Sequence, residues 1–242
     1  MIIKRLVALL LLVAIGSIFA TLLFGYSPDT ELNRTAHYYA ERTAADIGAA
    51  NIVTAIVVTY RGLDTLGEVT VLFLAASIVG LVLSRNMQLP NGLNAPNPPK
   101  APPQRAPVGE LLTTGTRYLV PMILLLGVYV FVNGHLTPGG GFQGGAIVAS
   151  GVLMLLLADP LKKFSHGLIS AIESLAGIFY VVVGLLGLLL AGGFLDNRFL
   201  PLGTLGELFS AGAIPLIYSL IGLKVGAEFS SMLADFSETE EL

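Results

Sequence analysis

Four ionisable side chains interrupt stretches of this sequence that are otherwise apolar enough to cross a lipid bilayer. They are Asp64, Glu68, Glu173 and Lys224. Because a charged side chain is costly at membrane depth, such residues are by default candidates for ion pathways. A carboxylate held in a low-dielectric surrounding can exchange a proton or bind a cation. These residue types therefore predict the handling of a small cation, Na⁺ or H⁺.

The first two carboxylates belong to a dense cluster at the junction of two predicted spans. Arg61 and Asp64 are close enough in sequence for a local ion pair, and Asp64 and Glu68 would share one face of a helix. Two interpretations of Glu68 stay open. Either it exchanges ions, or it only closes a capping box in which Thr65 is the N-cap, while Asp64 only pairs with Arg61.

The second cluster, His135–Gly145, is rich in glycine and lies between two predicted spans. It contains a formal G-x-G-x-x-G pattern, but a dinucleotide site needs a strand and a βαβ unit around that pattern. The glycines instead predict a tight re-entrant turn where the backbone passes close to a neighbour. His135 is a candidate proton relay, although we favour a hydrogen-bonded interface histidine. The residues to which we assign structural roles in the two clusters are Arg61, Gly62, Thr65, Thr137, Pro138, Gly139, Gly140, Gly141, Gly144 and Gly145.

Glu173 lies about two turns into the sixth predicted span, roughly 9 Å along the helix axis. Lys224 lies near the inner end of the seventh span, on the same predicted side of the membrane. The two side chains are therefore candidates for a mutual ion pair. We favour two other options for Lys224, which are snorkelling to the interface or pairing with Glu228 four residues later. Gly222 and Gly226 predict a close helix contact beside it.

The elements that must position these groups are membrane helices. Hydrophobic residues make up 54% of the 242 residues and charged residues only 12%, against about 25% charged in an ordinary soluble domain. Barrel strands would alternate apolar and polar residues, which these long apolar runs do not. We therefore predict an all-α polytopic membrane protein with about seven transmembrane helices. The spans are predicted near residues 5–25, 44–60, 66–85, 113–133, 142–158, 167–192 and 205–228.

Composition also excludes several kinds of site. Cysteine is absent, which rules out cysteine-ligated zinc, iron–sulfur clusters and disulfides in this chain. The three histidines are scattered without the spacing of metal ligands, so we expect no metal and no cofactor. The net charge of −3 without a basic cluster gives no sign of a nucleic-acid partner. We expect no catalytic centre in this chain.

One segment divides the chain into modules. Residues 86–108 are rich in proline, which is typical of an extended, semi-rigid linker. We predict a three-helix module over residues 1–85 and a four-helix module with an acidic tail over residues 109–242. If the N-terminus is outside, most Lys and Arg residues fall on the inner side, which predicts an N-out/C-in orientation. Lys4 and Arg5 argue for the opposite.

Three predicted outer turns resemble helix starts. The tetrapeptide Thr-Leu-Gly-Glu occurs at residues 65–68 and again at residues 204–207, and each copy fits a capping box. For Glu207 we favour the capping role over ion exchange. Thr137 and Pro138 fit an N-cap followed by proline at the first helical position.

The two clusters carry a resemblance to a known family. Residues Asn51–Glu68 resemble the C-terminal end of the MrpA subunit of Mrp-type multisubunit Na⁺/H⁺ antiporters, a piece that also exists as the MbhE-type subunit of membrane-bound hydrogenases. Residues His135–Gly145 and Ile217–Gly226 are similar to the MnhB/MrpB domain, which is the MbhF-type subunit of hydrogenase complexes. The two matches cover roughly residues 40–85 and 112–230.

The resemblance departs from true Mrp antiporters in one respect. In those, the RGLDTLGE-like segment ends a very long chain, whereas here no antiporter body precedes it. This arrangement is similar to the split subunits of the group 4 membrane-bound [NiFe] hydrogenase and the sulfane-sulfur reductase. It implies a non-redox subunit of a membrane arm through which ferredoxin oxidation in a peripheral arm drives Na⁺ or H⁺. It also implies MrpC-, MrpD- and MrpE/F/G-like partners in the cytoplasmic membrane of a prokaryote.

Two alternatives stay open beside this interpretation. The chain could be a subunit of a multisubunit Na⁺/H⁺ secondary antiporter without a redox arm, because both kinds of complex use the same helices. It could also be a purely structural membrane scaffold that carries no ions, since close-packing motifs are as prominent as charges in this sequence.

Overall fold

The computed structural model describes residues 2–26, 31–88, 109–159 and 165–239. Within these ranges every regular element is a helix, which confirms the predicted all-α class. The chain divides into two compact units, residues 1–38 and 39–242.

The first unit consists mainly of one helix, α1 (Ile2–Gly25). Its segment Lys4–Gly25 is long and apolar enough to cross a membrane, and none of it is buried by the rest of the described chain. Large apolar side chains cover all its sides, as expected for a helix surrounded by lipid or by another protein. Helix α2 (Arg34–Ile47) begins in this unit and ends in the second.

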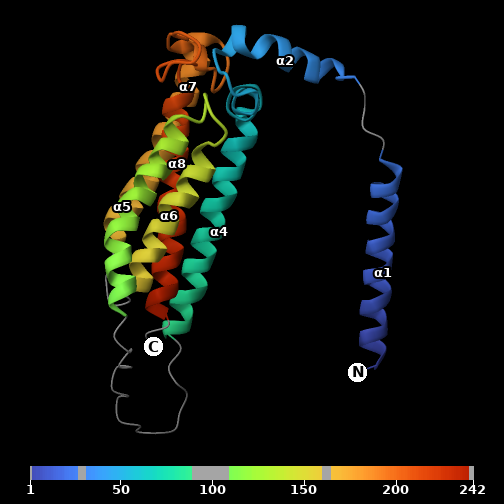
Figure 1. The fold of residues 1–242 in the computed structure, drawn as a ribbon, viewed down its shortest axis with the longest axis vertical. Helices are drawn as coiled ribbons and strands as arrows, with labels where there is room; N and C mark the ends of the chain where they lie inside the picture. Colours follow the sequence, from blue (N-terminus) through green and yellow to red (C-terminus); the bar gives the residue numbers. More distant parts are fainter. Residues whose placement is uncertain (1, 27–30, 89–108, 160–164, 240–242) are drawn as a thin grey trace. The chain divides into compact units, whose positions relative to one another are not determined.

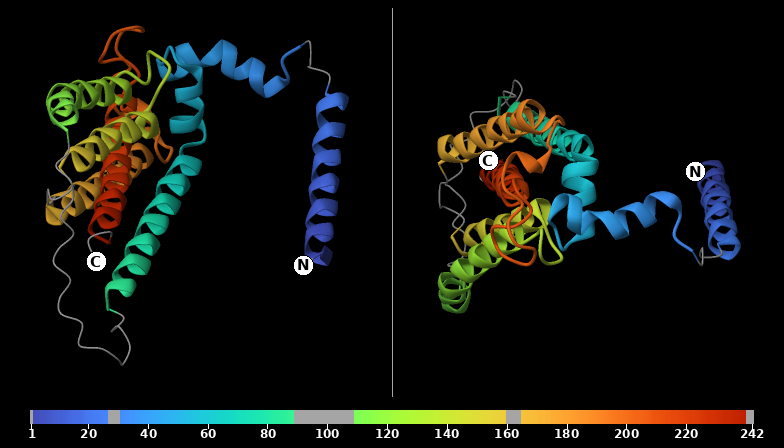
Figure 2. Two further views of the ribbon diagram at one scale, coloured as in Figure 1. Left: turned by 60° about the horizontal axis from the view of Figure 1, so that its bottom comes forward. Right: turned by 90° about the horizontal axis from the view of Figure 1, so that it is seen from above.

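Five long helices that alternate in direction form the bundle of the second unit (Figure 1). They are α4 (Gly62–Gln88), α5 (Glu110–Val132), α6 (Gly141–Ala158), α7 (His166–Ala191) and α8 (Ile214–Thr239). Helix α8 contacts each of the other four, and Figure 2 shows it between α7, α4 and the α5–α6 pair. A charged side chain on α8 is therefore better shielded from lipid than one on any other helix of the bundle.

Six described helices are long and apolar enough to cross a membrane, and a seventh crossing exists only if α2 and the residues after it count as one broken span. This agrees with the predicted count of about seven. The span predicted near residues 44–60 is wrong as a single helix, because the chain bends by 84° between Arg34–Ile47 and Ile52–Tyr60. Gly48 makes the bend with a φ of 75°, a left-handed conformation that ends helices and favours glycine.

Asn51 starts the next helix. Its side-chain oxygen accepts a hydrogen bond from the backbone N–H of Thr54 at 3.3 Å, as an N-cap does. Helix α3 (Ile52–Ala55) continues directly into η1 (Ile56–Tyr60), a π-helical turn that ends just before α4. The polar residues that weaken the apolar pattern here therefore mark a break rather than the middle of a span.

Two predicted capping positions are wrong. Helix α4 begins at Gly62, so Thr65 lies inside it and donates to the carbonyl of Val57 at 2.6 Å. Helix α6 begins at Gly141 instead of Pro138, and the Thr137 hydroxyl donates to a carbonyl of the preceding turn. In both places the threonine hydroxyl donates to the carbonyl of a residue earlier in the chain. A local capping pattern does not predict such a bond.

The seventh span, predicted near residues 205–228, is displaced, because α8 begins at Ile214. Residues 204–207 form an isolated turn instead of a capped helix start. The loop before α8 is held by the fully buried Asn197, whose side-chain amide donates to the carbonyls of Ile47 and Ala211, each at 2.9 Å. These long-range bonds outweigh the local capping signal.

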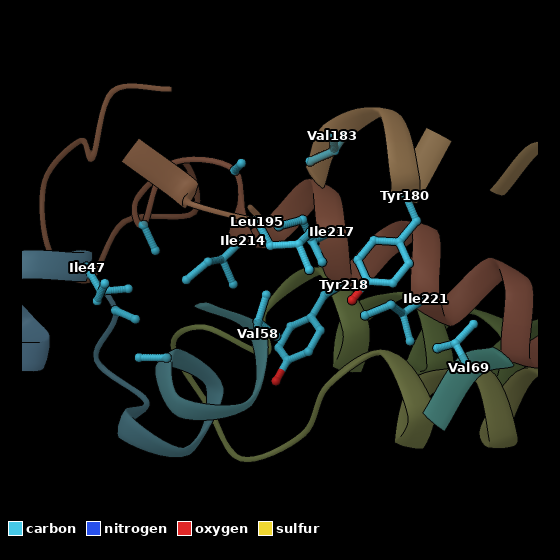
Figure 3. Packing of buried hydrophobic residues seen from close by; sticks show 14 of the residues in the cluster. Ile47, Val58, Val69, Tyr180, Val183, Leu195, Ile214, Ile217, Tyr218 and Ile221 are labelled. Carbon is cyan, nitrogen blue, oxygen red and sulfur yellow. The ribbon is translucent and has the colours of Figure 1, made fainter. Parts of the chain in front are cut away.

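The main apolar core lies at this end of the bundle (Figure 3). It joins Ile47 at the end of α2, Val58 of η1, Leu195 of the loop after α7, and Ile214 and Ile217 of α8. All five side chains are buried. The core thus fixes the start of α8 against the segments that precede α4 and follow α7.

Glycines let α6 approach both of its neighbours. A Cβ on Gly144 would lie 2.7 Å from the carbonyl oxygen of Gly127 in α5, and a Cβ on Gly145 would lie 2.8 Å from that of Gly222 in α8. No side chain fits at such distances, so the backbones meet directly. This confirms the close helix contact predicted from Gly222 and Gly226.

Two further predictions stay predictions. The first is the division into modules at residues 86–108; α4 continues to Gln88, and residues 89–108 lie outside the described residues. In space α4 packs on α8, which follows that segment in the chain. The second is the N-out/C-in orientation. Some of the basic residues that support it lie outside the described residues, namely Lys100, Arg105, Lys162 and Lys163.

Candidate functional site

Helix α8 carries a buried ion pair. The Nζ of Lys224 lies 2.7 Å from Oε1 of Glu228, and the two side chains are 11% and 0% exposed. The four-residue spacing places both on one face of the helix. Of the options for Lys224, the structure therefore shows pairing with Glu228.

Neighbouring helices enclose this pair. The ring of Phe73, on α4, has its centroid 4.9 Å from Nζ of Lys224, within range of a cation–π interaction. On α7, Gly177 faces the lysine, since a Cβ there would lie at an ordinary van der Waals distance of 3.7 Å from Nζ. The other carboxylate oxygen of Glu228, Oε2, is buried without a hydrogen-bond partner among the described residues. The pair thus lies at the junction of α4, α7 and α8 with one acceptor unused.

Glu173 lies level with Glu228 across the interface between α7 and α8. These helices run in opposite directions, and Gly177 lies opposite Lys224. Glu173, four residues before Gly177, is therefore level with Glu228, four residues after Lys224. Glu173 is half-buried, and its carboxylate acts electrostatically on that of Glu228.

Residues of α7 and α8 also lie level further along, toward the end of α8. There Nδ1 of His166, at the start of α7, lies 3.9 Å from Oδ1 of Asp235. A Cβ on Gly80 of α4 would lie 3.4 Å from Oδ2 of the same aspartate. Polar groups therefore continue along the seam of α4, α7 and α8 below the buried pair.

Two carboxylates beside one ammonium leave one negative charge uncompensated when all three groups are ionised. An uncompensated charge inside the bundle is strongly unfavourable, so a further cation is attracted to the cluster. A proton fits, and Na⁺, a hard cation, prefers the oxygen ligands that carboxylates supply. No group of three or more His, Cys, Asp or Glu residues in the described part of the chain is arranged to hold a metal ion. In chemical terms, the uptake of one small cation would balance the charge of this cluster.

The carboxylates of the first sequence cluster lie apart from this pair. Asp64 forms a surface ion pair in which Oδ2 lies 2.5 Å from Nη2 of Arg61, with side chains 52% and 66% exposed. Such exposed pairs contribute little to stability. Glu68 is exposed on α4 and interacts electrostatically with Tyr180 of α7. Gly62 has a packing role, since a Cβ there would lie 2.9 Å from Cδ1 of Leu195.

His135 is fully buried in the turn between α5 and α6. Its Nε2 lies 3.3 Å from the carbonyl oxygen of Glu207, and its own carbonyl accepts the backbone N–H of Asn51 at 3.0 Å. Burial lowers the pKa of His135 below its ordinary value of 6.5, and the nearby backbone carbonyls oppose this only in part. A neutral, hydrogen-bonded histidine that joins two loops is what this geometry describes.

The rest of the glycine-rich cluster forms the predicted tight turn. Gly139 has a φ of 141°, which favours glycine, and α6 follows two residues later. The side-chain amide of Asn51 donates to the carbonyls of Gly134 at 2.9 Å and Thr137 at 3.0 Å. These two carbonyls of the irregular backbone are thus satisfied by protein, as buried polar groups near a membrane must be.

Sequence reasoning missed several residues on which the site depends. Asn51 and Asn197 hold the loops, and the buried Tyr180 hydroxyl has no hydrogen-bond partner among the described residues. Tyr218 donates to the hydroxyl of Thr54 at 3.1 Å, which donates to a carbonyl of the glycine-rich turn at 2.6 Å. The available signal was the presence of polar residues within apolar runs, which indicates a break or a buried contact without naming the partner.

Two family models match the chain. The one described as a domain related to the MnhB subunit of Na⁺/H⁺ antiporter matches residues 111–231. The one described as MbhE, a subunit of MBH, matches residues 3–98. An uncharacterized protein of Methanocaldococcus jannaschii is 32% identical over 197 residues, which cover 75% of this chain and 74% of that protein.

Two solved structures have the same fold. A chain of the membrane-bound sulfane sulfur reductase, an archaeal respiratory membrane complex, is 39% identical with a TM-score of 0.79, and the match covers 97% of this chain and 98% of that chain. A chain of the Mrp complex from Dietzia sp. is 27% identical with a TM-score of 0.76, and the match covers 97% of this chain but only 26% of that chain.

The buried pair gives a first prediction, on stability. Lys224→Met leaves the Glu228 carboxylate buried without its counter-ion and should cost about 3–5 kcal/mol of unfolding free energy. The double variant Lys224→Met/Glu228→Met replaces both charges by apolar groups and should recover most of that loss. Thermal unfolding in detergent measures both, with Glu110→Gln, an exposed residue at the start of α5, as control. The pairing would be contradicted if the double variant lost as much unfolding free energy as Lys224→Met and Glu228→Met lose together when each is measured alone.

Proposed function

Because the chain belongs to the family of domains related to the MnhB subunit of Na⁺/H⁺ antiporters, we propose that it lines a path for Na⁺ or H⁺ in the membrane arm of a larger complex. The observation that carries the proposal is the enclosed Lys224–Glu228 pair with Glu173 level beside it. Ionisable groups inside membrane helices are costly, which favours a role in function over one in packing. The cation is cargo, and the role requires no cofactor in this chain.

Each group would have a distinct part. Lys224 neutralises Glu228 and holds it at the junction of three helices. Glu173 would then be the group that takes up and releases the cation, because it is half-buried and has no ion-pair partner among the described residues. Glu68, and Asp64 before it, would be exchange groups on the outer face of α4. His135 would have a structural role in this scheme.

We further infer that the complex is a ferredoxin-driven respiratory one, of the sulfane-sulfur-reductase or [NiFe]-hydrogenase type. The likeness to the reductase chain at 39% identity, against 27% for the Mrp chain, supports this type. The match of residues 3–98 to the MbhE family model supports the same type of complex. This chain would be a non-redox subunit in the cytoplasmic membrane of a prokaryote, beside MrpC-, MrpD- and MrpE/F/G-like subunits and a peripheral redox arm.

A second candidate is a subunit of a secondary Na⁺/H⁺ antiporter that has no redox arm. The description of the MnhB-related family and the likeness to the Mrp complex favour it. Both candidates use the same helices of this chain and the same cation. They differ in the subunits that accompany it.

The composition of the complex is the second prediction. Tagged chain, purified from its native membrane in mild detergent, should bring down Mrp-like membrane subunits together with iron–sulfur or [NiFe] subunits, identified by mass spectrometry. Membrane subunits without redox subunits would select the antiporter. Purification as a stable, isolated monomer would contradict both.

Transport by the assembled complex is the third prediction. In complexes reconstituted into vesicles, Glu173→Gln and Glu228→Gln should each lower Na⁺-dependent transport at least about tenfold, because an obligatory path loses a charge. Glu110→Gln, at an exposed position on α5, should leave transport unchanged.

Subunit composition is checked for every variant, so that loss of assembly is separated from loss of transport. A purely structural scaffold predicts intact transport in both glutamate variants. That result in an assembled complex would reject the ion path through this chain.

A further inference from the structure

We infer that a membrane helix of another subunit packs on the exposed face of α4 and presents a cationic or hydrogen-bond-donating side chain to Glu68. The inference rests on the proposed membership of a membrane complex and adds the partner of this carboxylate.

Glu68 lies within a spanning segment but is not covered by its own chain. Only 6% of the Gly62–Leu83 segment is buried, and Glu68 is among its exposed residues. It lies six residues into α4, roughly 9 Å along the axis, and one turn beyond the surface pair of Asp64 with Arg61. A carboxylate that faces lipid at such a position is unfavourable, so it needs a polar cover.

The inner side of Glu68 is occupied by this chain. Its helix neighbours Thr65 and Val69 are buried, whereas Asp64 and Val71 are exposed, so Glu68 lies at the edge of the packed face. On that edge its carboxylate interacts electrostatically with Tyr180.

The Tyr180 side chain is 1% exposed, and its hydroxyl has no hydrogen-bond partner among the described residues. Figure 3 shows its ring reaching from α7 toward Tyr218 and Ile221 of α8. Glu68 itself makes no ion pair and no hydrogen bond with any described residue. An acceptor on α4 and a donor on α7 thus interact electrostatically, and neither has a hydrogen-bond partner among the described residues.

The outer side of the seam has the character of a helix-packing surface. Val71, Ala75 and Val82 lie on the same side of α4 as Glu68 and are exposed. Gly67 beside them has open space where a Cβ would be. Small and apolar residues along one helix face permit close approach of a second membrane helix. Asp64 on this face is already paired with Arg61, so the charge of Glu68 selects a partner that carries a Lys, Arg, His, hydroxyl or amide side chain at that depth.

Helix α1 of the same chain carries two cations, Lys4 and Arg5, at its start. Between Leu6 and Gly25 its only hydroxyl residues are Ser17 and Thr21. Each donates to a carbonyl of its own helix, at 2.8 Å. A lipid acyl chain offers no donor at all. In the proposed complex a helix of another subunit is the occupant that supplies such a group to Glu68, and attachment to α1 is a separate outcome of the test.

Site-specific photo-crosslinking in the intact native complex tests this inference. A benzophenone-bearing phenylalanine replaces Val71, and the attached peptide is sequenced by mass spectrometry. We expect an apolar span of another subunit with one of the named polar side chains within one helical turn of the attachment point. The same probe at Leu125 of α5, which is 70% exposed, is the control and should not attach to that span.

Charge reversal supplies the second arm. Glu68→Lys should abolish the crosslink from position 71, Glu68→Gln should keep it, and a carboxylate placed at the identified partner residue should restore it in Glu68→Lys. Attachment only to lipid, to α1 of the same chain, or to a span without such a side chain would overturn the inference.

The crosslink tests the interface on α4, and the transport assay tests the ion path, so each can be rejected without the other. A crosslink as expected, with transport intact in Glu173→Gln and Glu228→Gln, would uphold this interface and reject the ion path. Lipid-only attachment with transport lost in those variants would do the reverse.

Discussion

The structure depends on one constraint, which is that the Lys224–Glu228 pair must be enclosed on every side. A charged pair in a membrane protein is tolerated only where other helices replace both water and lipid. This explains why α8, which carries the pair, is the helix that contacts α4, α5, α6 and α7. It also explains why the aromatic ring of Phe73 lies over the ammonium.

Contacts at the other end of the bundle determine which residues of α7 and α8 lie level around the pair. Asn197 ties the loop before α8 to the end of α2, and Asn51 ties the start of α3 to the glycine-rich turn before α6. These bonds fix where α8 begins, and hence which residues of α7 and α8 are level. If α8 began several residues earlier, Glu173 would not lie level with Glu228. The buried amides are thus a structural condition for the electrostatic cluster.

Local patterns were sufficient for part of this account. Long apolar runs predicted α1, α4, α5, α6 and α7, and the four-residue spacing suggested the partner of Lys224. The bend at Gly48 and the late start of α8 were not predictable, because they depend on contacts such as that of Asn197 with Ile47, 150 residues apart in sequence. The role of Tyr180 was hidden for the same reason, since an aromatic residue in an apolar run gives no sign of a carboxylate on another helix.

The central claim is that the cluster of Glu173, Lys224 and Glu228 takes up a cation, and infrared difference spectroscopy of the reconstituted complex tests it most directly. Addition of Na⁺, or a change of pH, should produce a carboxyl-band difference that disappears in Glu173→Gln and persists in Glu110→Gln. A difference spectrum that is the same in Glu173→Gln as in the unmodified complex would contradict the claim.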